Sequence, residues 1–462
     1  MSTQFPPEIT IQILIRLPIP SILQCMCVCK TWCSLITTSN FISTRLYFTL
    51  SNPNPPLFIR HYTESPKKEH FSLQCNPQSF QTYQTLPSPF HPTKKLYHRI
   101  VGSVHGLVCL SDDIFGYTYK ICIWNPLVKR YLDLPKPNVT FSQVGPYMFV
   151  LGFGFDSKSN DFKVVRMVYA QGDDGDEIPP VVEVFAVKER VWRKIDAKNV
   201  KSCCVECVWS QCFLNGFIHW VSYDKTVEEV EDRKRVRIKN LILLFNVSDE
   251  SFSTMELPDD LAKVNPLTMF VSVIKGSLSI LKYAYAGEGK DGTVENCEIW
   301  VQKEYGVKDS WSKMYKVEAE KGFELVLGVR ENGEILLAKN TCKTEDEGEL
   351  VSYDDKSKRV NGLGLYGFSD AFYAGAYTES LHLLEKDSGA VSYEDPVETN
   401  ATERSANSKP QQSSGTGLSF IELFIRSLGL NDDGEEGNRL AKDELNEFKL
   451  LSCSHQMTKF QQ

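Results

Sequence analysis

Two different hydrophobic patterns divide the chain near residue 45. Up to that point, apolar residues recur every three or four positions, which is typical of amphipathic helices. The segment 6–18 carries apolar residues at this spacing, namely Ile9, Ile13, Leu14 and Leu17. The pattern predicts a short first helix that ends at the Leu17-Pro18 step, because proline interrupts a helix.

Two more short helices are predicted before residue 45. Pro20-Ser21 favours a helix start, and the apolar residues that follow are Ile22, Leu23, Met26 and Val28. A third helix is predicted over 31–36, with its buried side formed by Trp32, Leu35 and Ile36. Three helices in fewer than 45 residues form too small a core to be stable alone. We therefore expect a partner to cover part of their apolar surface.

From about residue 45 onward, alternating segments rich in β-branched and aromatic residues predict strands. One unit recurs, in which an apolar strand, a turn and a second strand ending near an aromatic residue follow each other. It occupies 70–87, 120–135, 181–196, 241–258, 297–317 and 349–366. Most of these units follow another apolar strand or pair of strands, at 100–112, 149–156, 212–224, 269–283 and 324–339.

Four strands per unit at a regular spacing predict a β-propeller, which we expect to have six blades. The segment 370–384 should pair with strands near 46–87, so that the ring closes and no sheet edge stays open. After residue 387 the chain is rich in Ser, Thr, Asn and Pro, which is typical of a disordered linker. The predicted parts are therefore a helical module at 1–44, a propeller at 45–386 and a tail at 387–462, in which 418–430 has the pattern of a short helix.

Composition and charge exclude several functions. The net charge of −8 argues against a general binder of nucleic acid, since phosphate contacts need clustered Lys and Arg. The most basic run, 231–240, alternates charged residues with Val236 and Ile238, as a strand with one solvent-facing side would. No apolar stretch is long enough for a transmembrane helix, and the first residues do not resemble a signal peptide. We expect a protein of the cytoplasm or nucleus that binds neither nucleic acid nor membrane.

Cysteines are the most unusual feature of the helical module, where they occur at positions 25, 27, 29 and 33. A zinc site usually needs two Cys-x2-Cys pairs or comparable ligands, and every spacing here is two or four. Redox sensing stays open as an alternative. The pattern favours small, buried apolar residues that pack in a core.

Candidate chemistry in the propeller is sparse. The eight histidines are scattered, and His105 and His219 are predicted to pack beside turn glycines. Cys204 and Cys207 have a metal-ligand spacing but no second pair nearby. We expect no catalytic residues, no metal and no cofactor. Polar insertions at 170–180, 228–237 and 287–296 should form exposed loops, which commonly carry recognition on a rigid scaffold.

The first 40 residues resemble the F-box. The pattern Pro-x-Glu, then Ile-Leu-x-Arg-Leu-Pro, then Val-Cys-Lys-x-Trp and Leu-Ile stands here as "PPEITIQILIRLPIPSILQCMCVCKTWCSLI". Phe5 replaces the usual Leu, and Gln24, Met26 and Cys33 stand where many plant members have Arg. A helix-turn-helix DNA reader is the rival interpretation, and it would need a more basic second helix.

This resemblance implies docking on a Skp-type adaptor and, through it, on a cullin–RING ubiquitin ligase. Buried apolar residues dominate the energy of such interfaces. The residues expected to contact the adaptor are Phe5, Pro6, Ile9, Ile13, Leu14, Leu17, Pro18, Leu23, Val28 and Trp32.

The segments "GSVHGLVCL", "IWNPLVKRYLDLP", "LGFGFDSKSNDFKVVRMVY" and "CFLNGFIHW" resemble the plant F-box-associated domain, which is kelch-like. The resemblance implies a substrate receptor of a Skp–cullin–F-box ubiquitin ligase, in which propeller loops bind an unknown target protein. Two alternatives are an F-box scaffold or decoy without ubiquitin transfer, and a propeller enzyme with ionisable residues in its central channel.

Overall fold

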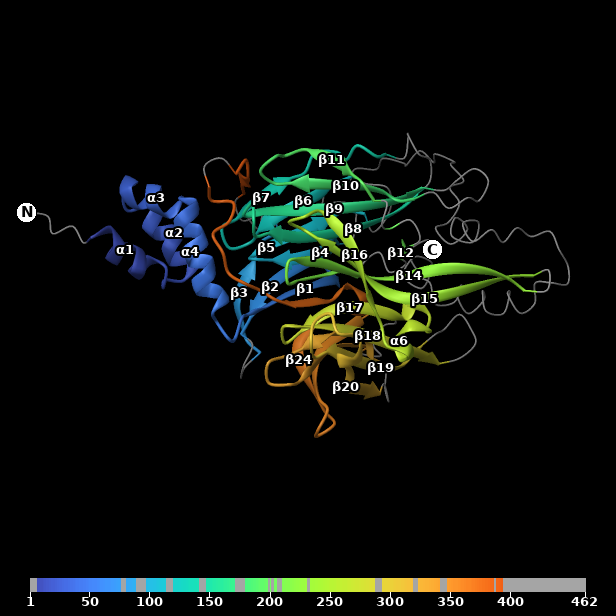
Figure 1. Ribbon diagram of the computed structural model, residues 1–462. Coiled ribbons are helices and arrows are strands. Elements are labelled where there is room, and N and C mark those ends of the chain that lie inside the picture. The colour runs from blue at the N-terminus through green and yellow to red at the C-terminus, as the bar shows by residue number, and fades with distance from the viewer. Residues whose placement is uncertain are drawn as a thin grey trace, which may run out of the picture.

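The computed structural model describes residues 6–393 except for short gaps at 76–79, 89–96, 114–118, 141–146, 171–178, 198–199, 201–202, 206–209, 231–232, 287–292, 319–322, 341–346 and 386–387. Four helices lie together at one end of the molecule, and strands make up most of the rest (Figure 1). The helices are α1 (Pro7–Leu14), α2 (Ile19–Met26), α3 (Lys30–Ile36) and α4 (Ser39–Leu50).

The first three helices confirm the prediction, and the fourth was not foreseen. Helix α4 begins after Thr38, whose hydroxyl accepts a hydrogen bond from the Phe41 amide at 3.2 Å. It then continues past residue 44, where we placed the end of the helical module. Its buried residues are Phe41, Ile42, Arg45 and Leu46.

The strands form six antiparallel sheets in the described part of the chain, which we number as blades in chain order. Blade 1 contains β25 (Tyr373–Ala376), β1 (Leu57–Glu64), β2 (Lys67–Gln74) and β3 (Thr82–Leu86). Blade 2 contains β4 (Arg99–Val104), β5 (Leu107–Ser111), β6 (Ile121–Asn125), β7 (Arg130–Asp133) and β26 (Val391–Ser392). Blade 3 contains β8 (Tyr147–Asp156), β9 (Asp161–Ala170), β10 (Val181–Ala186) and β11 (Trp192–Ile195).

The other three blades follow the same plan. Blade 4 contains β12 (Cys203–Cys204), β13 (Cys212–Leu214), β14 (Phe217–Val230), β15 (Arg233–Asn246) and β16 (Ser251–Glu256). Blade 5 contains β17 (Met269–Ile274), β18 (Ser277–Ala286), β19 (Thr293–Gln302) and β20 (Trp311–Glu318). Blade 6 contains β21 (Phe323–Val329), β22 (Ile335–Asn340), β23 (Glu347–Asp354) and β24 (Arg359–Phe368). A short helix, α6 (Asp259–Ala262), precedes blade 5.

Shared hydrophobic clusters join the blades into a closed six-bladed propeller. Alternate residues of one strand face the two neighbouring blades, as Leu336 and Leu337 of β22 show. Leu336 packs with Ile59 of blade 1, and Leu337 packs with Leu281 of blade 5. The same arrangement holds between each successive pair of blades. Inner strands such as β5 and β6 are therefore buried on both faces, which explains the nearly continuous apolar runs in the sequence.

The ring closes as the sequence predicted. Strand β25 from the end of the propeller pairs antiparallel with β1 from its start, with Leu57 opposite Ala376 and Arg60 opposite Tyr373. Blade 1 is thus built from both ends of the propeller. Because β25 completes blade 1, residues far apart in the chain become neighbours at this position.

The ring has two different sides, because antiparallel pairing places alternate connections at opposite ends of the strands. Tight turns such as His105-Gly106, Asn215-Gly216 and Lys275-Gly276 lie on one side, which we call the turn side, and both residues of each turn have positive φ. Helix α4 leads into β1 at this side. The connections of the opposite side, here the loop side, include the longer insertions.

One insertion expected to be a loop is instead a long hairpin. Strands β14 and β15 each extend over 14 residues and stay paired in register from Phe217–Asn246 to Val230–Arg233. The hairpin projects from the ring on the side away from the helices (Figure 1). The prediction of an exposed loop at 228–237 is therefore wrong in its conformation. Residues 171–178 and 287–292 of the other two insertions, and the predicted helix at 418–430, lie outside the described residues.

Substitution of Gly152 tests how tightly the blades pack. A Cβ atom at Gly152 of β8 would overlap the Trp220 ring and lie 2.8 Å from Ile218 Cγ2, both in blade 4. We expect Gly152→Ala to lower the free energy of unfolding by about 1–3 kcal/mol, the usual effect of overpacking. Chemical denaturation measures this change. Ser253→Ala at an exposed position of β16 is the control and should have little effect; equal losses in both variants would contradict the packing argument.

Candidate functional site

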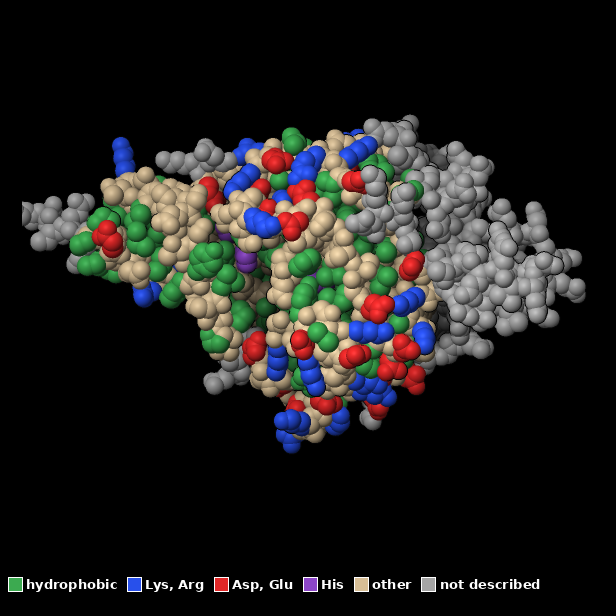
Figure 2. All heavy atoms as spheres, viewed as in Figure 1, with side chains coloured by type: hydrophobic (Ala, Val, Ile, Leu, Met, Phe, Trp, Pro, Cys, Tyr) green, Lys and Arg blue, Asp and Glu red, His purple; other side chains and the backbone are tan. Residues whose placement is uncertain are grey.

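The helical end of the molecule presents apolar side chains to solvent. Ile9 and Ile13 lie one helical turn apart on α1, where they are 46% and 52% exposed, and Val28 in the α2–α3 turn is 66% exposed. Figure 2 shows hydrophobic side chains gathered at this end of the molecule. Large apolar residues that cluster at an exposed site mark an interaction surface.

The predicted adaptor-binding residues fall into three groups. Pro6, Ile9, Ile13, Pro18 and Val28 are exposed, and Leu17, Leu23 and Trp32 are half-buried. Leu14 is only 2% exposed and belongs to the core beneath the helices. It therefore supports the surface from behind, whereas we expected it to contact the adaptor. Phe5 lies outside the described residues.

The cysteines of this module do not pack in the core as a set. Helix α2 ends at Met26, so Cys27 and Cys29 lie in the following turn and are exposed. Cys25 and Cys33 are half-buried, and Cys25 packs against the core. The prediction of buried packing is thus wrong for Cys27 and Cys29, because both lie between α2 and α3 and face solvent. Among the described residues, no three His, Cys, Asp or Glu side chains are grouped as a metal site would require.

Sequence reasoning missed the exposed apolar residues of α4. Tyr47, Phe48 and Leu50 are large and substantially exposed, and the Arg16 guanidinium of the α1–α2 turn lies 5.8 Å from the centre of the Phe48 ring. Recognising 39–50 as a helix could have revealed these exposed residues. The strand-like pattern that begins near residue 45 masked it.

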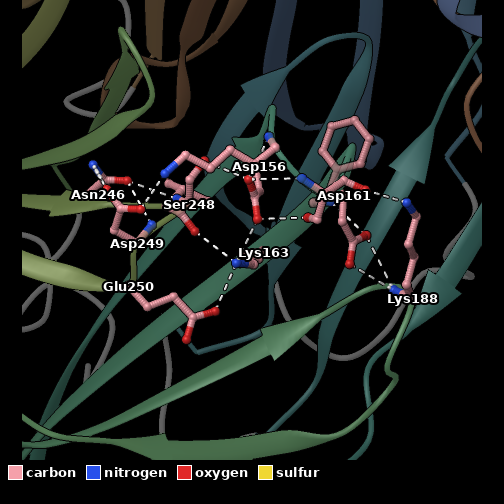
Figure 3. Close-up of polar contacts among 12 residues, drawn as sticks. Asp156, Asp161, Lys163, Lys188, Asn246, Ser248, Asp249 and Glu250 are labelled. Carbon is pink, nitrogen blue, oxygen red and sulfur yellow. Dashed lines mark hydrogen bonds and ion pairs between the residues drawn. The ribbon is translucent and has the colours of Figure 1, made fainter.

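The ionisable residues of blade 3 form a structural network. Asp156, at the end of β8, accepts hydrogen bonds from the Ser159 hydroxyl at 2.7 Å and from the Ser248 hydroxyl at 2.6 Å. Lys163 of β9 lies 2.9 Å from Asp156 and 2.8 Å from Glu250 and donates to the Val247 carbonyl (Figure 3). These contacts attach blade 3 to the β15–β16 turn of blade 4.

The pKa values in this network follow from its hydrogen bonds. Burial by itself would raise the pKa of Asp156, but donors on Ser248, Lys163 and Ser159 outweigh it and hold the pKa well below its usual range. Burial would likewise raise the pKa of Glu250, but Arg193 and Lys163 outweigh it, so that the pKa is lowered. Every charged group is thus paired, which is the arrangement of a structural ion network.

The histidines that we singled out also pack. His219 is fully buried, and its Nε2 lies 2.8 Å from the Tyr305 hydroxyl; burial lowers its pKa to about 4. His105 is half-buried and its ring lies edge-on to Phe155 at 4.6 Å. Burial lowers its pKa to about 4 as well, with a smaller effect from His382. Cys204 is half-buried, and its expected zinc-spacing partner Cys207 lies outside the described residues.

Helices with an exposed apolar surface, fixed on a six-bladed ring, define a propeller-based interaction protein. Models of known families agree with this class: the F-box domain matches residues 3–44, and the F-box associated beta propeller domain matches residues 45–384. The chain belongs to the F-box proteins that carry an F-box associated beta propeller domain. An F-box implies binding to a Skp-type adaptor.

Two relatives illustrate the similarity over most of the chain. F-box protein At3g07870 of Arabidopsis thaliana is 27% identical over 420 residues, which cover 81% of this chain and 91% of the relative. F-box protein CPR1 of the same plant is 24% identical over 405 residues, which cover 82% of this chain and 88% of the relative. Within the described part of the chain, we find no helix that is long and apolar enough to cross a membrane.

Acid should weaken the network between blades 3 and 4. Because the pKa values of Asp156 and Glu250 are lower in the folded than in the unfolded state, their stabilisation is complete above the unfolded values. It is lost as the pH falls from about 5 toward the folded values. Asp156→Asn should lower the free energy of unfolding by about 1–3 kcal/mol at pH 7, with a smaller difference from wild type at pH 3.

Chemical denaturation at several pH values measures this difference. Asp249→Asn, in the β15–β16 turn, is the matched control, since Asp249 is half exposed and pairs with exposed Lys158 and neighbouring Asn246. A loss of stability in Asp156→Asn that is independent of pH would show that the network does not contribute through its charge.

Proposed function

We propose that this protein is the substrate-recognition subunit of a Skp–cullin–F-box ubiquitin ligase. Its helices would dock on the Skp-type adaptor, and the loop side of its propeller would hold the target protein. The ligase would operate in the cytoplasm or nucleus. The protein then contributes binding and placement: it raises the effective concentration of the target protein near the ubiquitin-charged enzyme.

The observation that carries this proposal is the exposed ridge on the helices. Ile9, Ile13 and Val28 face solvent although they are apolar, while Ile15, Ile19 and Ile22 close the core behind them. Burying such anchors in a partner supplies most of the affinity of an interface. Because helices and loop side lie at opposite ends of the molecule, adaptor and target protein can bind at the same time (Figure 1).

Two alternatives stay open. An F-box scaffold or decoy would bind the adaptor without promoting ubiquitin transfer. A propeller enzyme would need reactive side chains free to meet a substrate. The ionisable groups described above in blades 3 and 4 are paired with one another, and His219 is fully buried. These observations favour the binding function over the enzyme.

Adaptor binding should depend on the exposed ridge of α1. We expect the double variant Ile9→Ser/Ile13→Ser to weaken affinity for a purified Skp-type adaptor at least tenfold, about 1.4 kcal/mol, since both side chains lose their contact with the partner. Isothermal titration calorimetry measures the affinity. The thermal midpoint should change little, because both residues are already about half exposed.

The matched control is Val360→Ser, since Val360 is 47% exposed but lies on β24 of blade 6. Its affinity for the adaptor should equal that of wild type. If wild type does not bind the adaptor, or if the α1 double variant binds equally well, the proposed docking surface is wrong. Co-purification of a cullin with wild type but not with Leu17→Ala/Pro18→Ala separates ligase assembly from adaptor binding alone.

Recognition of the target protein should depend on the projecting hairpin of blade 4. We replace residues 226–237 by Asn-Gly, which joins Lys225 to Ile238, two residues opposite each other in the register. Proximity labelling with the proteasome blocked should then lose neighbours that wild type retains. Adaptor affinity is the control and should not change. An identical set of neighbours in both proteins would exclude the hairpin from recognition.

A further inference from the structure

One short segment connects ring closure to the helices. Residues 377–385, which we call the strap, directly follow β25, the strand that closes blade 1. In Figure 1 the orange chain of this region runs between α4 and the blades. The strap therefore lies between the helices and the propeller.

The strap is anchored on the turn side of the propeller. Asn125, at the end of β6 and fully buried, donates from Nδ2 to the carbonyl of Ser380 at 3.1 Å and to that of His382 at 2.9 Å. The Tyr377 hydroxyl donates to the Gly106 carbonyl at 2.9 Å. Arg130 Nη1 donates to the Leu383 carbonyl at 2.9 Å.

Glycine allows one of these contacts. At Gly106, which has a φ of 81°, an added Cβ would lie 2.5 Å from the Thr378 carbonyl oxygen and 2.8 Å from Ser380 Cβ. The strap thus lies directly against the β4–β5 turn. This close approach leaves it little freedom to shift.

The opposite surface of the strap belongs to the core of the helices. Tyr377, Leu381 and Leu384 are buried in a single hydrophobic cluster. The same cluster contains residues of all of the first four helices or their ends, and residues of blades 1 and 2, including Leu14, Ile22, Ile36, Phe41, Phe58 and Trp124. The helices therefore rest on the strap, and the strap rests on the propeller.

A buried arginine adds a polar contact across this junction. Arg45 of α4 is only 4% exposed, and its Nη2 lies 3.5 Å from Glu379 of the strap and 3.4 Å from the Leu17 carbonyl. Its guanidinium carbon also lies 5.6 Å from the centre of the Phe48 ring. One side chain thus connects α4, the α1–α2 turn and the strap.

We propose that the strap is a positioning element that fixes the orientation of the F-box helices relative to the loop side of the propeller. Strand β25 closes the ring, and the strap that directly follows it packs against the helices. Ring closure and the placement of the helices are therefore coupled. This inference rests on the proposed function for its purpose: a fixed orientation presents the bound target protein in one direction from the adaptor. The contacts by which the strap holds the helices on the propeller do not depend on that function.

The test weakens the contacts of the strap with α4 and with blade 2 and leaves the exposed residues Ile9, Ile13 and Val28 unchanged. Arg45→Met removes the polar contact between α4 and the strap. Asn125→Ala removes two of the hydrogen bonds that hold the strap on blade 2, those to the carbonyls of Ser380 and His382. Hydrogen exchange followed by mass spectrometry should show at least tenfold faster exchange in α4 and in 377–385, while β17–β20 of blade 5 exchange as in wild type. Lys263→Met, which removes an exposed cation paired with Asp259, is the matched control.

Small-angle X-ray scattering of the complex with a Skp-type adaptor tests whether the helices keep a fixed orientation relative to the propeller. The two variants should give a larger maximum dimension than wild type, and adaptor affinity should stay within twofold, because Ile9, Ile13 and Val28 are unchanged. Unaltered exchange in α4, or equally faster exchange in every blade, would overturn the inference. If Asn125→Ala does not fold, Arg45→Met decides the outcome. If wild type does not bind the adaptor, the proposed function is wrong. The hydrogen-exchange result then still tests the proposed role of the strap.

Discussion

The pairing of β25 with β1 is the contact on which the rest of this structure depends. Each blade has two apolar faces, and only a complete ring gives each of the six sheets a neighbour on both sides. The cluster between blades 6 and 1 contains Ile59 on one side and Leu350 on the other, and it exists only when blade 1 lies beside blade 6. Closure thus converts a series of marginal hairpins into one cooperative core.

Closure has a second consequence, since it places the end of the propeller under the beginning of the chain. The helices cannot form a sufficient core by themselves. Residues of the strap and of blades 1 and 2, such as Leu381 and Trp124, complete that core from the turn side. Apolar residues on the opposite surface of the helices, Ile9 and Ile13 among them, are left for a partner. The protein is therefore asymmetric, with the exposed apolar surface of the helices at one end and the loop side of the propeller at the other.

The motif "GFGFDSKSND" shows how conspicuous polar residues can serve the fold. Asp156 binds the Ser159 hydroxyl in its own turn and the Ser248 hydroxyl of the next blade, and Lys163 completes the connection. A pattern of this kind can be mistaken for a catalytic or phosphate-binding motif. Its geometry instead explains why charged residues recur beside tight turns, where the strands end and a buried polar contact can orient neighbouring blades.

The sequence alone determined the helices up to residue 36, the four-stranded units and the closing segment, because local periodicity and turn residues encode them. The family was indicated by the resemblance of its motifs. Several features depended on tertiary contacts. Leu14 and Ile13 are adjacent and equally apolar, yet only the packed core decides that the first is buried and the second exposed. The pattern from residue 45 onward favours a strand, yet α4 stays helical to Leu50, with its Phe41 and Leu46 in the core. The sequence predicts pairing over the whole of 370–384, whereas the pairing with β1 ends with β25 at Ala376. The role of the strap arises only when the ring brings residue 379 against residue 45.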